Sequence, residues 1–244
     1  MAVLNAFAEA KRPLTMAELD RLTGCGRSAI QRIVYTLKSL GYLNQLTQSK
    51  QYVLSTRMFE FAHVYSHPGS LFRLAEPILE ELNLTSGETV NLTVLDGQEV
   101  VYVLRYVTHH VVSVNLQIGS RLPAYCTAPG RAMLAHLPKS EVQMIFDQSI
   151  LTQRTPHTII DPAALLAKLE EAIENGYAVN DQEAFVGDIS VAAPVLSDTG
   201  RPVAAVNIAV PYPRWTAEDA NEKLAPLILA AASQLSALLG FVNA

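Results

Sequence analysis

The sequence predicts an α+β protein with a small, mainly helical N-terminal module and a larger body in which helices cover an antiparallel sheet. Short amphipathic segments with helix-capping residues fill the first 41 positions. Runs of β-branched residues separated by turn dipeptides recur after residue 88. Charge divides the chain as well: residues 1–55 hold seven of the 18 Lys and Arg residues but three of the 23 acids, a net +4 against −9 for the remainder. This asymmetry is typical of a basic binding module attached to an acidic body.

Two short helices are expected before residue 24. Residues 2–10 form the first, and Thr15-Met-Ala-Glu18 has the residues of a capping box, which begins the second. The residues expected to point inward from the second helix are Ala17, Leu19 and Leu22. A turn containing Gly24 then separates it from a third amphipathic segment, the arrangement of a helix-turn-helix.

The third segment, residues 26–41, is predicted to be the recognition helix. Its apolar side consists of Ile30, Ile33, Val34, Leu37 and Leu40. Its other side presents Arg27, Ser28, Gln31, Arg32, Tyr35 and Lys38, with no acid among them. Gly41 stands where a left-handed C-terminal cap belongs. Cationic, amide and hydroxyl groups opposite an apolar seam are typical of a helix that lies in a DNA major groove.

A short hairpin is expected behind this helix, with strands at 42–43 and 52–54 around a polar tip at 47–50. It would be the wing of a winged helix-turn-helix, and Lys50 would meet phosphates. The alternative is a helical hairpin that packs on another element and uses its charges for solvation. We place the DNA-binding domain at 1–55, a linker helix at 56–67 and the remaining domain at 68–244. Within the linker, Glu60, His63 and His67 have the spacing of metal ligands on one helical face, but ordinary packing explains them and no metal is expected.

The body is expected to begin with a helix over 70–84, its seam formed by Leu71, Leu74, Ile78 and Leu82. Strands are predicted at 89–95, 100–107, 111–116, 177–179, 189–196 and 202–210. Residues 119–123 are expected to be a loop. Further helices are predicted at 127–137, 139–147, 162–175 and 217–239, with Asp161 and Thr216 as N-caps and Gly176 as a stop.

No catalytic motif is found in the body. The sequence has no Gly-x-Ser-x-Gly elbow, P-loop, His-Glu-x-x-His or dinucleotide glycine pattern. Cys25 and Cys126 have no metal or redox spacing, and nothing near Cys126 supports a thiol nucleophile. Polar residues instead occupy loop and strand positions, namely Tyr125, Cys126, Thr127, Asn180, Ser190 and Asn207. A small-molecule site has this composition, although each buried amide or hydroxyl could equally bind backbone.

The N-terminus lacks a signal-peptide pattern and no stretch is long and apolar enough for a membrane span, so we expect a soluble, cytoplasmic protein. No cofactor is expected.

At residues 119–135 (GSRLPAYCTAPGRAMLA) the chain resembles the IclR-type transcriptional regulators. The resemblance continues through Arg154-Thr-Pro-His-Thr-Ile, Asp161-Pro162, Gly176-Tyr177 and the strand at 190–195, and it covers essentially the whole chain. The Leu-Pro-Ala-Tyr-Cys-Thr and Arg-Thr-Pro-His-Thr segments look most like the subgroup that regulates protocatechuate and hydroxybenzoate catabolism.

This resemblance implies a GAF-like effector-binding domain and homodimers, often dimers of dimers, that bind a pseudo-palindromic double-stranded DNA operator. Family positions near the effector fall on Val111, Val114, Ala128, Pro129, Asn180, Ser190, Asn207 and Ala209, to which we add Tyr125. Asn180 stands where relatives that bind small keto acids place an acid, and Asn207 and Ala209 stand where two serines are frequent. Pro129 lacks an N–H that could hold a carboxylate. An anionic effector would therefore need other donors, such as Arg105 and the Asn side chains.

We therefore expect a sequence-specific DNA-binding regulator controlled by a small-molecule effector, an aromatic or small organic acid of a catabolic pathway, rather than an enzyme. One alternative is an enzyme that acts on a small molecule and carries an accessory winged helix. Another is a winged helix used for protein interaction alone.

Overall fold

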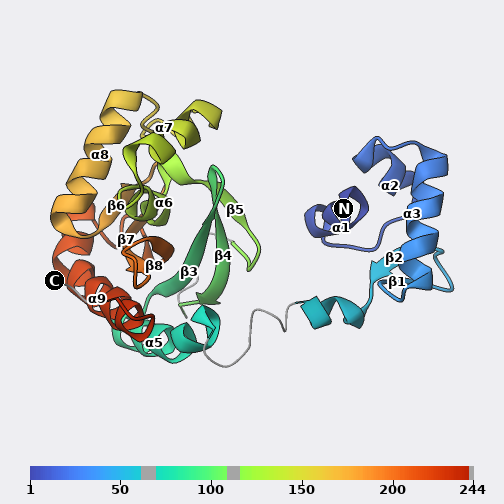
Figure 1. Ribbon diagram of the computed structural model, residues 1–244, viewed down its shortest axis with the longest axis horizontal. Helices are drawn as coiled ribbons and strands as arrows, with labels where there is room; N and C mark the ends of the chain where they lie inside the picture. The colour runs from blue at the N-terminus through green and yellow to red at the C-terminus, as the bar shows by residue number, and fades with distance from the viewer. Residues whose placement is uncertain (62–69, 109–115, 242–244) are drawn as a thin grey trace. The chain divides into compact units, whose positions relative to one another are not determined.

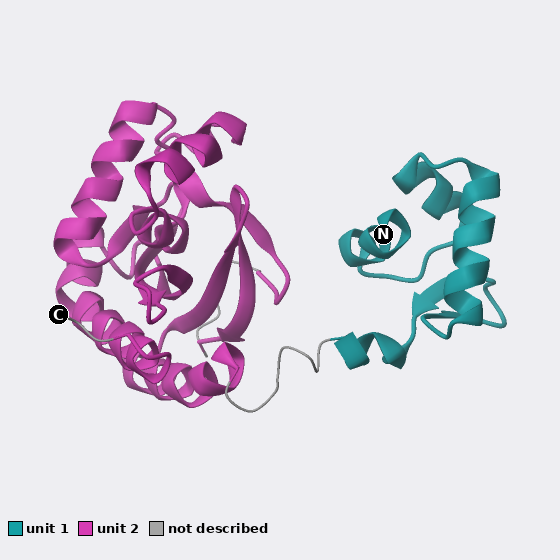
Figure 2. Ribbon diagram, in the orientation of Figure 1, with its two compact units in different colours: residues 1–68 teal, residues 69–244 magenta. Residues whose placement is uncertain are grey.

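The computed structural model describes residues 1–61, 70–108 and 116–241. The chain forms two compact units, Met1–Pro68 and Gly69–Ala244 (Figure 2). The helices of unit 1 are α1 (Ala2–Ala10), α2 (Met16–Thr23) and α3 (Arg27–Ser39), followed by strands β1 (Leu43–Gln45) and β2 (Tyr52–Leu54) and the 3₁₀ turn η1 (Thr56–Met58). The predicted helix-turn-helix and wing are both confirmed (Figure 1).

The core of unit 1 is small and apolar. It consists of Val3, Ala6, Phe7, Leu14, Leu19, Ile30, Val34 and Leu43. Of the residues expected to point inward from α2, Leu19 is confirmed, since it is fully buried, whereas Ala17 is exposed and Leu22 is 45% exposed, so those two expectations were wrong. Ala17 lies two positions before Leu19, about 200° around a helix, so the two cannot share a face.

Local capping signals fix the ends of these helices. The capping box at α2 is confirmed: the Thr15 hydroxyl accepts from the Glu18 N–H at 3.2 Å, and the Glu18 carboxylate accepts from the Thr15 N–H at 2.8 Å. Gly41 has φ 80°, the Tyr42 N–H donates to the Leu37 carbonyl and the Gly41 N–H donates to the Lys38 carbonyl. This is a Schellman motif, and the predicted cap at Gly41 is confirmed.

Unit 2 is built on one six-stranded antiparallel sheet with strand order β5-β4-β3-β8-β7-β6. Its strands are β3 (Thr89–Asp96), β4 (Glu99–Tyr106), β5 (Arg121–Pro123), β6 (Ala178–Asp181), β7 (Asp188–Leu196) and β8 (Pro202–Pro211). Its helical elements are α5 (Leu71–Ser86), η2 (Ala124–Cys126), α6 (Ala128–Leu134), α7 (Lys139–Gln148), α8 (Pro162–Asn175) and α9 (Ala217–Leu238). The predicted α+β body is confirmed, as are the N-caps of α8 and α9.

Both faces of the sheet are covered. One apolar cluster joins α5 and α9 to alternate residues of β7 and β8, such as Val191 and Val206. A second cluster joins α6, α7 and α8 to the other face, where Ala192 and Ala205 point. The same separation of helices is visible in Figure 1. Because side chains alternate along a strand, β7 and β8 each contribute one set of residues to each cluster.

The sheet differs from the prediction at its β5 edge. The loop expected at 119–123 contains strand β5, which pairs Val100 with Leu122 at the sheet edge. That pairing depends on β4, a partner that no local pattern reveals. The strand expected at 111–116 falls almost wholly outside the described residues, and Leu116, its described member, has no strand structure.

Gly130 explains how closely α6 packs against the segment before it. A Cβ atom at this position would lie 2.2 Å from the Ala124 carbonyl oxygen, which a real side chain cannot do. The glycine therefore lets α6 and η2 meet, and the Thr127 hydroxyl caps α6 by accepting from the Gly130 N–H. This contact places the start of α6 against the sheet.

Candidate functional site

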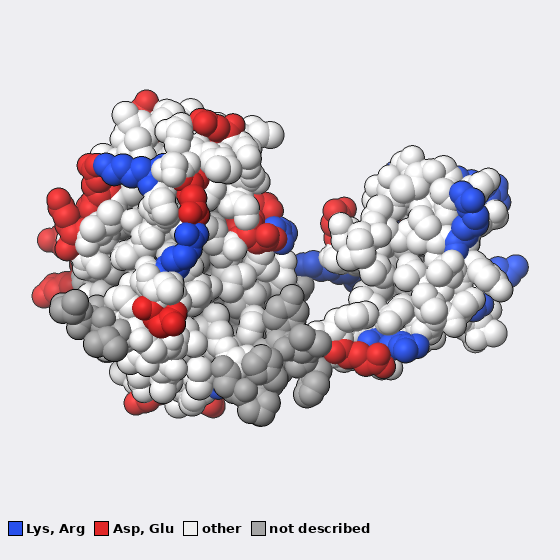
Figure 3. All heavy atoms as spheres, in the orientation of Figure 1, with Lys and Arg blue, Asp and Glu red and all other residues white. Residues whose placement is uncertain are grey.

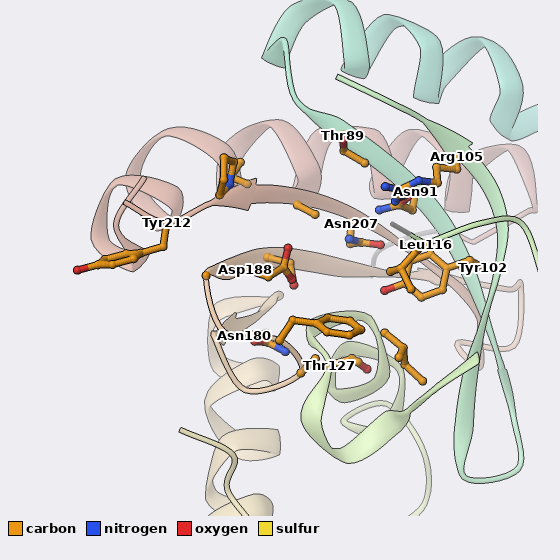
Figure 4. Close-up of a pocket in the computed structure, with 18 of the residues that line it drawn as sticks. Thr89, Asn91, Tyr102, Arg105, Leu116, Thr127, Asn180, Asp188, Asn207 and Tyr212 are labelled. Carbon is orange, nitrogen blue, oxygen red and sulfur yellow. Dashed lines mark hydrogen bonds between the residues drawn. The ribbon is translucent and has the colours of Figure 1, made fainter. Parts of the chain in front are cut away.

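A cavity of about 280 Å³ lies on the sheet face that also packs against α6 (Figure 4). Its floor comes from β3, β4, β7 and β8, and its walls include Thr127 at the start of α6 and the segment 184–188. Leu116, Leu122 and Phe185 supply apolar surface. An apolar cavity with a few oriented polar groups is the usual form of a small-molecule site.

The polar floor follows from strand register. Antiparallel pairing places Asn180, Ser190, Ala209 and Thr89 in one row across four strands. The next row consists of Ala192, Asn207, Asn91 and Arg105. All of these residues share one face of the sheet, because paired residues on neighbouring strands point to the same side, as do residues two positions apart along one strand. The remaining part of this face is alanine-rich or apolar and packs against α6.

A β-bulge brings Tyr102 and Arg105 to the same cavity. In a regular strand, residues three apart face opposite sides. β4 shifts register opposite Leu92 and Thr93, which leaves Val103 as an extra residue. Tyr102 and Arg105 therefore both line the cavity. Bulges commonly redirect side chains in this way, and sequence reasoning named Arg105 but missed Tyr102.

Asn91 and Asn207 are the most unusual polar groups of the floor. Both are 1% exposed and lie directly opposite each other on β3 and β8. Arg105 Nη1 donates to Asn91 Oδ1 at 2.8 Å. Among the described residues, Asn91 Nδ2 and Asn207 Oδ1 have no hydrogen-bond partner. Unpartnered buried polar atoms are rare in folded proteins and often mark a binding site.

The charge in the cavity comes from one acid and one base among the described lining residues, Asp188 and Arg105. Burial raises the pKa of Asp188 to about 7, and the positive charge of Arg105 opposes that rise. Burial also lowers the pKa of Arg105 and raises that of Tyr102. Near neutral pH the Asp188 carboxyl is therefore partly protonated and can donate as well as accept a hydrogen bond.

Asn180 lines the cavity, but its side-chain amide is used within the protein. Its Nδ2 donates to the Cys126 carbonyl, and its Oδ1 accepts from the Glu183 N–H at 3.0 Å. The amide of Asn180 therefore bonds backbone in the structure, the alternative that the sequence also allowed. The amide fixes the turn after β6 against the start of α6.

A buried ion pair holds the cavity wall. Arg131 is 1% exposed and Glu183 5% exposed, and Arg131 Nη2 donates to Glu183 Oε2 at 2.6 Å while Nη1 donates to Oε1. Arg131 Nε also donates to the Tyr125 carbonyl, and Glu183 Oε2 accepts from the Ile159 N–H. The pair ties α6 and the 159 segment to the wall that begins at Ala184. The sequence showed no sign of this network.

The other predicted effector residues fall partly inside and partly outside the cavity. Tyr125 is not among the residues that line the cavity. Its hydroxyl donates to the Thr152 carbonyl at 2.7 Å and accepts from the Thr152 N–H at 3.0 Å. Ala128 and Pro129 are buried in the first turn of α6 and are not part of the cavity surface. Val111 and Val114 lie outside the described residues. Ser190, Asn207 and Ala209 do line the cavity.

The second candidate site is on unit 1. All seven residues predicted to contact DNA have exposed side chains: Arg27, Ser28, Gln31, Arg32, Tyr35, Lys38 and Lys50. Lys38 Nζ donates to Gln45 on β1 at 2.9 Å, so this cation is held beside the wing. A hollow of about 400 Å³ lies between the start of α2, the start of α3 and the wing tip, where Arg27 and Lys50 line it. Figure 3 shows most of the acidic surface in view on unit 2.

The C-terminal end of α3 is bonded to the chain that follows the wing. The Ser55 hydroxyl donates to the Gly41 carbonyl, and Arg57 Nη1 donates to the Leu40 carbonyl at 2.6 Å. The Arg57 guanidinium also lies 5.1 Å from the centre of the Tyr42 ring, and that ring contacts Phe61. The end of α3 is therefore fixed to η1 and the residues after it.

The described residues offer neither a metal site nor a membrane-spanning helix. They hold no group of three or more His, Cys, Asp or Glu residues placed to bind a metal. Glu60 is described, whereas His63 and His67 are not. None of the described helices is both long and apolar enough to cross a bilayer.

A helix-turn-helix with a basic exposed helix, joined to a body with a polar-floored cavity, defines a ligand-responsive regulator of transcription. Residues 1–47 match the IclR helix-turn-helix domain, and residues 63–237 match the bacterial transcriptional regulator IclR C-terminal domain. The chain belongs to the IclR family of bacterial transcriptional regulators.

Individual relatives agree with this assignment. The Pca regulon regulatory protein of Pseudomonas putida is 33% identical over 236 residues, which cover 96% of this chain and 80% of the relative. The regulator KdgR of Escherichia coli is 30% identical over 239 residues, 98% of this chain and 90% of the relative. The crystal structure of Thermotoga maritima IclR is 25% identical with a TM-score of 0.79, covering 98% of this chain and 96% of that one.

An IclR homologue from Microbacterium hydrocarbonoxydans, complexed with 4-hydroxybenzoate, has the same fold. It is 24% identical with a TM-score of 0.86 and covers 98% of this chain and 96% of its own.

Proposed function

We propose that this regulator binds operator DNA as a homodimer, or a dimer of dimers, in the bacterial cytoplasm, and that a small organic acid bound in the unit 2 cavity controls its DNA affinity. The observation that carries the proposal is the pairing of an exposed basic recognition helix in unit 1 with a polar, partly charged cavity in unit 2. A site for DNA and a separate site for a ligand are the two elements that allosteric control requires.

On the DNA side, α3 would enter the major groove. Arg27, Gln31 and Arg32 would face base edges, since arginine and glutamine pair with guanine and adenine edges. Arg27 and Lys50 line a hollow with Asp20, and the two cations would contact the phosphate backbone beside that groove. Two copies of α3 in a dimer would read half-sites about one helical turn or a multiple apart, hence a pseudo-palindromic operator.

On the ligand side, the cavity suits a single-ring aromatic acid or a short aliphatic acid. Its volume of about 280 Å³ is near the lower end of the range of about 300–1,000 Å³ for ligand sites. Arg105 supplies a positive charge for a carboxylate. The name of the Pca regulon relative fits the protocatechuate subgroup that the sequence resembles, which supports an aromatic acid from a catabolic pathway.

The first experiment measures DNA affinity with and without ligand. Fluorescence anisotropy with DNA from upstream of the protein's own gene should show tighter binding than random DNA of equal length. An aromatic acid that binds the cavity should change the operator affinity by roughly 5–150-fold. Equal affinity for both DNAs, together with no response to any acid, would refute the proposal. Light scattering should give a dimer or tetramer, and a monomer at DNA-saturating concentration would contradict the operator model.

A matched pair of variants tests the cavity. Arg105→Leu should abolish the response to acids while leaving ligand-free DNA binding unchanged. Arg121→Leu removes an arginine whose partners are the exposed Asp96 and Glu99, so it should leave the response intact. The enzyme alternative is tested separately by incubating the protein with aromatic and keto acids: product formation beyond a protein-free control would favour it.

A further inference from the structure

The row formed by Arg105, Asn91 and Asn207 has a fixed hydrogen-bonding direction. Arginine has donors and no acceptors, so the atom of Asn91 that faces Arg105 at 2.8 Å must be its Oδ1. Asn91 Nδ2 is therefore a donor that faces away from Arg105, buried and without a partner among the described residues. Figure 4 shows Asn91 beside Arg105, with Asn207 next to them on the cavity floor.

Asn207 provides the complementary acceptor. Its Oδ1 is buried and has no partner among the described residues. Apart from Asn91 across on β3, its neighbours on the same face are alanines: Ala205 and Ala209 along β8, and Ala192 across on β7. These small apolar side chains leave room beside the amide and offer it no hydrogen bond. A buried amide oxygen that has lost water and gained no hydrogen bond raises the free energy of the folded state. An apolar residue at position 207 would not carry this cost, so Asn207 lowers stability while the cavity holds no ligand.

We propose that Asn91 and Asn207 form a donor–acceptor pair that selects a hydroxylated organic acid. The acid's carboxylate lies beside Arg105 and accepts from Asn91 Nδ2, and a ligand hydroxyl donates to Asn207 Oδ1. Directly opposed residues in an antiparallel pair have Cβ atoms about 4.5–5.5 Å apart, so one small ligand can reach both amides. The inference rests on the proposed function, because it assigns a hydroxyl to the organic acid of that same cavity.

The structure also defines a competing explanation. A small rotation could let Asn91 Nδ2 donate to Asn207 Oδ1, in which case the amides would satisfy each other and select nothing. The two explanations differ in the ligand-free protein. If Asn207 Oδ1 is unpartnered, Asn207→Leu should leave the midpoint of thermal unfolding unchanged or raise it. If the amides bond each other, the same change should lower it.

Thr93→Val is the matched control for that stability test. Thr93 is fully buried on the same sheet face, and its hydroxyl donates to the Ala205 carbonyl at 3.3 Å. Removing a hydroxyl that has a partner should lower the unfolding midpoint. A midpoint that falls as much in Asn207→Leu as in Thr93→Val would overturn the proposal.

Ligand binding is then measured by calorimetry with matched acids: benzoate, its three monohydroxy isomers, 3,4-dihydroxybenzoate, and the pair propionate and lactate. In the wild-type protein the best hydroxylated acid should bind at least tenfold tighter than its matched parent. In Asn207→Leu that ratio should fall below about threefold, because the parent acid binds as well or better and the hydroxylated acid binds more weakly.

Failure of this inference and failure of the proposed function give different results. If the acids bind but the wild type does not prefer a hydroxyl, or if Asn207→Leu keeps the preference, the donor–acceptor assignment is wrong while acid control stands. If none of the acids binds or changes DNA affinity, the organic-acid effector is itself wrong.

Discussion

Asp188 should make the stability of unit 2 depend on pH in an unusual direction. This carboxyl group starts β7 and lines the cavity, and burial raises its pKa from 3.8 to about 7. Between these values the folded protein binds more protons than the unfolded chain. Stability therefore falls as the pH rises from about 4 to 7, the reverse of the usual behaviour of a salt-bridged carboxylate.

The magnitude follows from the size of the shift. One pKa unit corresponds to about 1.4 kcal/mol, so a rise from 3.8 to about 7 sets an upper limit of about 4 kcal/mol. About 3 kcal/mol of this limit develops between pH 5 and 8. Because solvent reaches part of Asp188 through the cavity, we expect about 2 kcal/mol in that window. Asp188→Asn removes the titration and keeps the size of the side chain. The stability of the variant relative to the wild type should therefore rise by about 2 kcal/mol between pH 5 and pH 8.

The assay is urea unfolding followed by tryptophan fluorescence. The sequence contains one tryptophan, Trp215, which lies in unit 2, so the signal reports that unit alone. The difference in unfolding free energy between variant and wild type is measured at pH 5, 6, 7 and 8. A difference that does not grow with pH would refute the reasoning, because it would mean that the wild-type carboxyl does not titrate in this window.

The same group gives a prediction for ligand binding: wild-type affinity for an organic acid should rise as the pH falls from 8 to 6, and Asp188→Asn should flatten that profile in calorimetry. Arg131→Met should destabilise unit 2 by about 3–5 kcal/mol in the urea assay, since it leaves the Glu183 carboxylate buried without its cation; a loss below about 1 kcal/mol would contradict this. Arg32→Ala should weaken operator binding more than random-DNA binding, and equal losses would remove Arg32 from base reading. Lys50→Ala should weaken both and lower the slope of log affinity against log salt by about 1; an unchanged slope would exclude a phosphate contact.

Unit 1 was predicted well because its signals are local. A capping box needs residues only three positions apart, and both Thr15 and Glu18 make the predicted bonds. The same is true of Gly41, whose cap is formed by its immediate neighbours. By contrast, strand β5 was expected to be a loop, because three residues become a strand only through pairing with β4. A helix end or a strand was therefore predictable where the residues that determine it lie within a few positions of one another.

The cavity was predicted less completely. Its β7 and β8 side could be found, since Ser190 and Asn207 interrupt otherwise apolar strands. Asp188 was missed although a signal existed: it lies two positions before Ser190 and so shares its face. Tyr102 had no such signal, because its orientation depends on a bulge in β4 that pairing with β3 creates. Nothing in the sequence indicated that the amide of Asn180 is bonded to the backbone of Cys126, 54 positions away, as well as to that of nearby Glu183.

The bonds at the end of α3 have a mechanical consequence. Ser55, Arg57 and the contact between Tyr42 and Phe61 attach the recognition helix to residues 55–61, the last described residues of unit 1. A force that rotates residues 55–61 would therefore rotate α3 with them, because these contacts connect the two. A rotation of a few degrees there would move the far end of this 13-residue helix, about 20 Å long, by an ångström or more, enough to lengthen a hydrogen bond to a base edge past its useful range.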